Sequence, residues 1–127
     1  MKFYMFPLLY FFLSGCSSSD RLERMIIIEP YKKHTSDRDT AICEEFNLTS
    51  EDIKNYFNYA ERLDSKDFHE QAIIFSCHYS GQLKKNGQVY HWEIYPAGAG
   101  YLFNDEVTEN YLCRSSDCPA SILGTTE

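Results

Sequence analysis

The clearest hydrophobic pattern lies in the middle of the chain and predicts a helix. Apolar residues follow helical spacing over about residues 50 to 63, at Ile53, Tyr56, Phe57, Ala60 and Leu63. Thr49 is a candidate N-cap with Asp52 three residues later, which is a near capping box. Leu48 and Ile53 fit a hydrophobic staple. We therefore expect a helix with one apolar stripe and boundaries good to about two to four residues.

The segment that follows alternates between apolar and polar residues and predicts a β-hairpin. The strands are expected at 71–83 and 88–95, with Asn86-Gly87 at the turn. Because side chains alternate faces along a strand, the expected core face comprises Phe75, Cys77, Tyr79, Leu83, Tyr90, Trp92 and Ile94. The other face is polar and carries Ser76, His78, Ser80, Gln82, His91 and Glu93. The core face is expected to pack against the helix stripe.

Two further strands are expected after a break at Pro96–Gly100, one at Tyr101–Phe103 and one at Val107–Cys113. The predicted fold class is α+β, with one helix packed on a three- or four-stranded antiparallel sheet that is stapled by disulfides. The short β-branched run at 25–28 is either an edge strand or an arm lying on the domain. Residues 32–40 are expected to be loop.

The N-terminus has the pattern of an export signal. Lys2 precedes an apolar run of 11 residues, Phe3–Leu13, and small residues follow it. A membrane-spanning helix needs about 20 apolar residues, so a stable transmembrane anchor is not expected. The expected division of the chain is a signal peptide at 1–15, a lipidated N-terminus and tether at 16–42, and a small α+β domain at 43–127.

Leu13-Ser14-Gly15-Cys16 resembles the lipobox of bacterial lipoproteins. The resemblance implies cleavage after Gly15 and acylation of Cys16 with diacylglycerol and a further chain such as palmitate, which anchors the protein in a lipid bilayer. Ser17, rather than Asp, follows Cys16, and the enterobacterial sorting rule then implies the periplasm-facing leaflet of the outer membrane rather than the inner membrane. The alternatives are an ordinary signal peptide with a structural Cys16, or a buried helix.

Charge and composition limit the classes of molecule that the protein is expected to bind. The 127 residues carry 12 Lys and Arg against 19 Asp and Glu, a net charge of −7, which repels nucleic acid, so no nucleic-acid partner is expected. Removing residues 1–15 takes Lys2 away and leaves 112 residues at −8. Aromatic residues make up 16% of the chain. Four tyrosines are candidates for an exposed partner-binding patch or for ordinary half-buried positions: Tyr59, Tyr95, Tyr101 and Tyr111.

With Cys16 assigned to lipid, four cysteines remain, and an exported chain favours disulfides between them. Three connectivities are possible, and the preferred one joins Cys43 to Cys77 and Cys113 to Cys118. A zinc site and a redox pair are alternatives. Both have weak support, because Cys77 and His78 point to opposite faces of a strand and the Cys113 to Cys118 spacing is not Cys-x-x-Cys.

The candidate catalytic residues are His78, His91 and Glu93, which share the polar face of the hairpin. Together they could supply a general base, its partner and a general acid. The competing interpretation is the solvated face of a one-sided sheet. Tyr79-Ser80-Gly81 lacks the first glycine of a nucleophile elbow, and Gly98 and Gly100 do not begin a phosphate-binding loop. No cofactor and no metal site are predicted.

From Cys43 to Cys113 the chain resembles small exported proteins of enterobacteria that have no assigned activity. The resemblance rests on the helix with Tyr56-Phe57, the strand with Ser76-Cys77 and the hairpin through Trp92. It implies no site residues. The predicted function is a non-catalytic, membrane-anchored binding or interaction module of the cell envelope. An immunity-type inhibitor of a toxin or envelope enzyme is one alternative, a small envelope enzyme with a His/Glu site is another, and a purely structural envelope component is a third.

Overall fold

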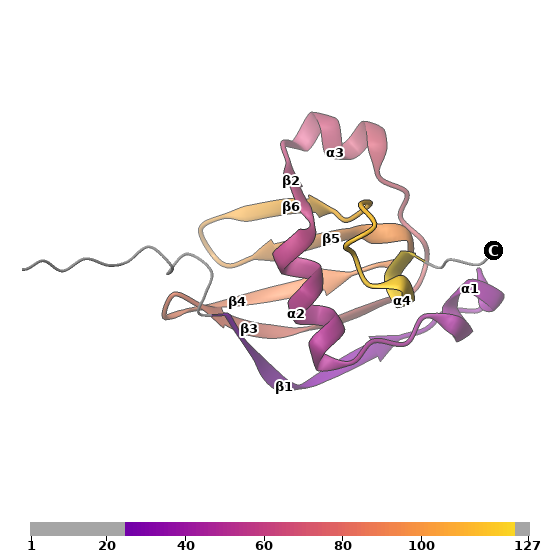
Figure 1. The fold of residues 1–127 in the computed structure, drawn as a ribbon, viewed down its shortest axis with the longest axis horizontal. Coiled ribbons are helices and arrows are strands. Elements are labelled where there is room, and N and C mark those ends of the chain that lie inside the picture. Colours follow the sequence, from indigo (N-terminus) through magenta and orange to yellow (C-terminus); the bar gives the residue numbers. More distant parts are fainter. Residues whose placement is uncertain (1–24, 124–127) are drawn as a thin grey trace, which may run out of the picture.

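The computed structural model describes residues 25–123. The expected signal peptide, the lipobox with Cys16 and the first part of the tether lie outside the described residues. One antiparallel sheet runs through the structure in the strand order β1-β3-β4-β5-β6-β2 (Figure 1). Its strands are β1 (Met25–His34), β2 (Glu61–Leu63), β3 (His78–Lys85), β4 (Gln88–Ile94), β5 (Ala99–Phe103) and β6 (Thr108–Leu112). The helical segments are α1 (Thr40–Glu45), α2 (Ser50–Tyr59), α3 (Ser65–Gln71), the 3₁₀ turn η2 (Pro96–Gly98) and α4 (Ala120–Leu123).

The α+β class is confirmed, and its expected detail is wrong. The sheet has six strands rather than three or four, and four α-helices occur within residues 25–123 rather than one. The additional strands are the two edges, β1 and β2. Both pair with strands distant in sequence, β3 and β6, and such pairing leaves little trace in local periodicity.

Helix α2 starts where its sequence signals place it. The Thr49 side chain accepts a hydrogen bond from the Asp52 backbone N–H at 3.1 Å, and the Asp52 carboxylate accepts one from the Thr49 N–H at 3.0 Å. This is a complete capping box. The helix ends at Tyr59 rather than near Leu63, because residues 61–63 leave it to form β2 against β6.

The predicted hairpin is present, but its first strand is shorter than expected. Strand β3 begins at His78, because Gln71 is the last residue of α3 and residues 72–77 form neither helix nor strand. The Asp64 side chain caps α3 by accepting a hydrogen bond from the Asp67 N–H at 2.8 Å. The turn lies at Asn86-Gly87 as predicted, with φ of 52° and 84°, the left-handed values that a tight hairpin turn requires.

The middle part of the expected tether belongs to the sheet. Residues 25–34 form the edge strand β1, which pairs with β3 from Met25↔Lys85 to His34↔His78. The register shifts between Ile28 and Lys32, around Pro30, so that the strand is irregular there. The run at 25–28 is therefore part of an edge strand rather than an arm lying on the domain, and this strand continues into the expected loop at residues 32–34.

The core lies between α2 and one face of the sheet (Figure 1). Trp92, Ile94 and Leu83 are fully buried on this helix-covered face, as expected from the alternation of the hairpin. Gly81 lies opposite Trp92 across the β3–β4 ladder, and an added Cβ there would come within 2.9 Å of the indole ring. The absence of a side chain at Gly81 therefore leaves the space that the Trp92 indole ring occupies. We call the other side of the sheet the open face.

Two disulfides tie the peripheral segments to this core. Cys43 of α1 is bonded to Cys77, and Cys113 is bonded to Cys118, each with 5.9 Å between Cα atoms. This is the pairing preferred from the sequence. The first bridge connects α1 to the start of β3, and the second holds the loop between β6 and α4. None of the helices within the described range is long and apolar enough to cross a membrane.

Candidate functional site

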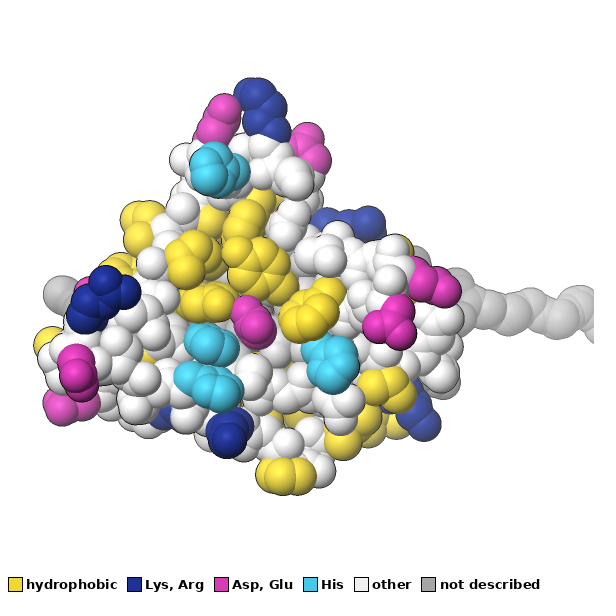
Figure 2. All heavy atoms as spheres, turned by 180° about the vertical axis from the view of Figure 1, so that it is seen from behind, with side chains coloured by type: hydrophobic (Ala, Val, Ile, Leu, Met, Phe, Trp, Pro, Cys, Tyr) yellow, Lys and Arg dark blue, Asp and Glu magenta, His cyan; other side chains and the backbone are white. Residues whose placement is uncertain are grey.

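The open face carries an array of polar and aromatic side chains at its centre. Histidine and acidic side chains gather there among hydrophobic ones, as Figure 2 shows. Glu93 lies at the centre, opposite Ser80 on β3 and Tyr101 on β5. His91 lies on the next row, opposite Gln82 and Phe103. We call the following set the Glu93 array: His34, His78, Ser80, Gln82, His91, Glu93, Tyr95, Tyr101 and Phe103.

A row of neighbouring aromatic rings, the first three of them stacked, crosses one side of this array. The ring centroids of His34 and His78 are 4.5 Å apart, and those of His78 and Tyr95 are 4.9 Å apart. Tyr95 then meets the edge of Tyr101 at 6.1 Å, and Tyr101 contacts Phe68 of α3 at 5.2 Å. The row therefore connects β1, β3, the end of β4, β5 and α3, and it makes this face a continuous aromatic platform.

Hydrogen bonds orient the polar members of the array. The Tyr95 hydroxyl donates to Glu93 Oε1 at 2.8 Å. His34 Nε2 and Ser80 Oγ lie 2.8 Å apart and share a hydrogen bond. The Glu93 carboxylate is thereby held beside the phenol of Tyr95 and faces outward from the middle of the sheet.

The array alters the acidity of its members. Burial lowers the pKa of His78, the Glu93 carboxylate opposes this by raising it, and His34 lowers it again. Burial and then the hydrogen bond to Glu93 raise the pKa of the Tyr95 phenol. Burial, followed by the charge of Glu93, raises the pKa of Tyr101. The surroundings thus favour the neutral imidazole of His78 and the neutral phenols of Tyr95 and Tyr101.

The three residues predicted as candidate catalytic groups share this face, but the two histidines lie apart. His78 lies beside Tyr95 in the ring stack, whereas His91 lies on the far side of Glu93 and stacks on Phe103 at 5.5 Å. Positions 91 and 95 are about 13 Å apart along an extended strand, at about 3.3 Å per residue. The two histidines therefore lie on opposite sides of Glu93, and of the two His78 is the one whose pKa the Glu93 carboxylate raises.

Sequence reasoning missed His34 as a member of this surface and the buried Phe68 as a contact of Tyr101. His34 falls in a segment expected to be loop, and only the pairing of β1 with β3 brings it against His78. Phe68 lies on α3, which occupies a stretch with no predicted element. The Asp64 to Asp67 spacing is a helix-start signal that could have indicated α3.

The four tyrosines predicted as candidates for an exposed patch differ in location and exposure. Tyr95 and Tyr101 are half-buried in the Glu93 array. Tyr59 on α2 is 51% exposed, whereas Tyr111 is buried in the core at 7%. The array therefore contains two of the four.

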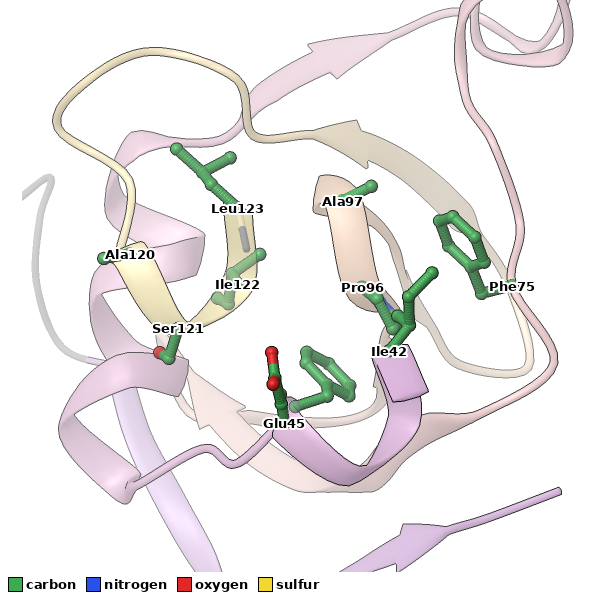
Figure 3. Close-up of a pocket in the computed structure, with 10 residues that line it drawn as sticks. Ile42, Glu45, Phe75, Pro96, Ala97, Ala120, Ser121, Ile122 and Leu123 are labelled. Carbon is green, nitrogen blue, oxygen red and sulfur yellow. The ribbon is translucent and has the colours of Figure 1, made fainter. Parts of the chain in front are cut away.

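Two other features of the structure bear on ligand chemistry. Within residues 25–123, no group of three or more His, Cys, Asp or Glu is arranged to hold a metal ion. A pocket of about 540 Å³ lies among α1, η2 and α4 and has mostly apolar walls, including Ile42, Phe75 and Ile122 (Figure 3). Glu45 points into this pocket, and no member of the Glu93 array lines it.

Comparison with known proteins finds no match: no family model, no curated protein and no solved structure matches the chain. The resemblances to lipoproteins and to small exported proteins of enterobacteria therefore stay predictions. The candidate site rests on its geometry alone.

Proposed function

We propose that the protein is a non-catalytic binding module of the bacterial cell envelope, whose open sheet face contacts a partner protein. The observation that carries the proposal is the Glu93 array, in which a carboxylate is set into an aromatic platform that α2 does not cover. Tyrosine-rich surfaces with few charges at their centre are typical of protein interfaces, because rigid rings supply contact area at a small entropic cost.

The proposed location depends on the N-terminal sequence. The lipobox Leu13-Ser14-Gly15-Cys16 supports acylation of Cys16 and attachment to the periplasm-facing leaflet of the outer membrane. The disulfides Cys43–Cys77 and Cys113–Cys118 support an oxidising compartment. A Cys16→Ala variant tests the anchor, because it should move the protein out of the membrane fraction and abolish acyl labelling. Unchanged fractionation would refute lipid attachment.

Site-specific crosslinking tests the binding surface. The photo-crosslinking residue benzoyl-phenylalanine replaces Phe103 on the open face or, as a control, Tyr59 on the exposed side of α2. Both full-length variants are expressed in cells and irradiated, and crosslinked products are separated by mass. We expect a discrete crosslinked protein from position 103 and none from position 59. The same product from both positions, or none from position 103, would contradict the proposal.

A further inference from the structure

A glutamate that accepts a hydrogen bond from a tyrosine two residues later occurs twice in the sheet. At the end of β4, the Tyr95 hydroxyl donates to Glu93 Oε1 at 2.8 Å. On β6, the Tyr111 hydroxyl donates to Glu109 Oε1 at 2.7 Å. The spacing places both members of each pair on the same side of a strand. The two units lie on opposite faces, because the Tyr111 ring packs against Phe57 of α2.

An arginine completes the unit on β6. Arg62 Nη1 lies 3.4 Å from Glu109 Oε2, the oxygen that Tyr111 does not use. The Glu109 side chain is only 14% exposed, and a carboxylate with so little access to water is stabilised by a paired cation. Arg62 comes from β2, so a residue distant in sequence supplies the charge.

The unit on β4 has no such cation within the chain as described. The ion pairs within residues 25–123 are Arg62–Glu109, Lys66–Glu70 and Arg114–Glu61, and no Lys, Arg or His nitrogen in that range lies within 4.0 Å of the Glu93 carboxylate. Glu93 is half-buried, and it lies beside the rings of Tyr95 and Tyr101. Its second oxygen makes no hydrogen bond within the described part of the chain. The Glu93–Tyr95 unit therefore resembles the Glu109–Tyr111 unit, except that no arginine of the described chain pairs with its carboxylate.

We propose that the open face receives an arginine side chain of the partner protein, with its guanidinium paired to Glu93 and stacked on the ring of Tyr101. The inference rests on the proposed function and adds the chemistry of the contact. Arginine suits the site better than lysine, because a planar guanidinium both pairs with a carboxylate and stacks on an aromatic face. The net charge of −7 is complementary to a basic partner.

Nuclear magnetic resonance titration tests the proposal directly. The ¹⁵N-labelled full-length chain, in micelles of an uncharged detergent, is titrated with acetyl-Gly-Arg-Gly-amide. A peptide with citrulline in place of arginine is the uncharged isostere, and a lysine peptide tests charge alone. We expect amide shift changes centred on β4 and β5 around Glu93. Binding of the citrulline and lysine peptides should be weaker, by about tenfold or more for citrulline, since hydrogen bonds to a charged group are the strong ones.

Two isosteric variants provide the matched comparison. Glu93→Gln still accepts the Tyr95 hydroxyl bond, so the fold should persist while the response to the arginine peptide disappears. Glu109→Gln makes the same change in the other unit and should leave the response on the open face as in the wild type. Shift changes spread over the acidic surface and unaltered by Glu93→Gln would overturn the proposal, as would equal binding of the arginine, lysine and citrulline peptides.

The outcomes separate this inference from the function on which it rests. If position 103 crosslinks to a partner but Glu93→Gln binds the arginine peptide as the wild type does, the proposed binding surface is supported and the proposed arginine contact is wrong. If the arginine peptide binds at Glu93 while position 103 crosslinks to nothing, the chemistry of the site is right and the proposed function is wrong.

Discussion

The hydroxyl of Tyr56 donates a hydrogen bond to the backbone carbonyl oxygen of Gly98, with 2.7 Å between the oxygen atoms. Tyr56 belongs to α2 and is 0% exposed, whereas Gly98 lies in η2 between β4 and β5. A Cβ atom added at Gly100 would collide with the same hydroxyl. The bond therefore fixes α2 over the turn that leads into the strand carrying Tyr101.

Tyr56→Phe should destabilise the protein by about 1 to 2 kcal/mol, because a buried hydrogen bond is lost while its acceptor stays buried. The Gly98 carbonyl also accepts the Cys113 N–H at 2.9 Å, which limits the cost. The free energy of unfolding is measured by denaturation with urea, followed through the fluorescence of the single tryptophan, Trp92. The control Tyr59→Phe changes an exposed hydroxyl and should alter stability by less than about 0.5 kcal/mol. Equal effects of the two variants would show that the buried bond contributes nothing.

The two disulfides should contribute unequally to stability. Cys43–Cys77 spans 34 positions and Cys113–Cys118 spans 5, so the first removes more conformational entropy from the unfolded chain. The loop-entropy model gives about 4 kcal/mol for the longer loop and about 2 kcal/mol for the shorter. Paired Cys→Ser variants of each bridge, compared by urea denaturation, measure this difference. A larger loss from removing Cys113–Cys118 would contradict the entropic order.

Stability should fall on mild acidification because of His78. Burial, the first cause, lowers the pKa of His78 below its usual value of 6.5. The unfolded chain therefore binds a proton at His78 more readily than the folded chain does. The contribution of His78 to the free energy of unfolding is complete above pH 6.5 and is lost as the pH falls toward the folded-state pKa. Below pH 6.5, His78→Gln should make the free energy of unfolding depend less on pH than in the wild type.

Two variants serve as controls for the His78 prediction. Glu93→Gln removes the carboxylate that raises the pKa of His78 and should therefore steepen the acid-side loss. His69→Gln, on the exposed surface of α3, should leave the curve as it is in the wild type. A His78→Gln protein with the same pH dependence as the wild type would sink the prediction.

Gly81→Ala should destabilise the sheet through its contact with the core tryptophan. The new methyl group would lie 2.9 Å from the Trp92 indole and 2.9 Å from the Tyr31 Cβ atom, and neither can move freely in the packed core. Overpacking of this kind costs about 1 to 3 kcal/mol. The neighbouring exposed substitution Gln82→Ala is the control and should stay within about 0.5 kcal/mol of the wild type. A stable Gly81→Ala protein with unchanged Trp92 fluorescence would contradict the argument.

Elements marked by short-range chemistry were predictable from the sequence. The capping box at Thr49 and Asp52 set the start of α2, and Asn86-Gly87 set the hairpin turn. Strands β5 and β6 lie within two residues of their expected ranges. Each of these signals works through groups only a few residues apart, so no knowledge of the rest of the fold is needed.

Elements that exist through long-range pairing were not predictable. Strand β2 has three residues and no hydrophobic alternation, and it forms because β6 offers a free edge. Helix α2 stops at Tyr59 for the same reason, although the apolar spacing continues to Leu63. In the candidate site, alternation placed His78, His91 and Glu93 on one face, but it could not show that His78 stacks with His34 and Tyr95 while His91 stands apart.

By itself, the sequence determined the start of α2, the hairpin turn and the faces to which the side chains of β3 and β4 point, whereas lipid attachment at Cys16 stays a prediction. These follow from spacing and from short motifs. The tertiary structure alone decided that β1 brings His34 to the open face and that Arg62 reaches Glu109 while Glu93 has no cation within the described chain. The physical reason is that the register between distant strands and the pairing of charges across them depend on which segments contact one another after folding, and local patterns of residues do not encode those contacts.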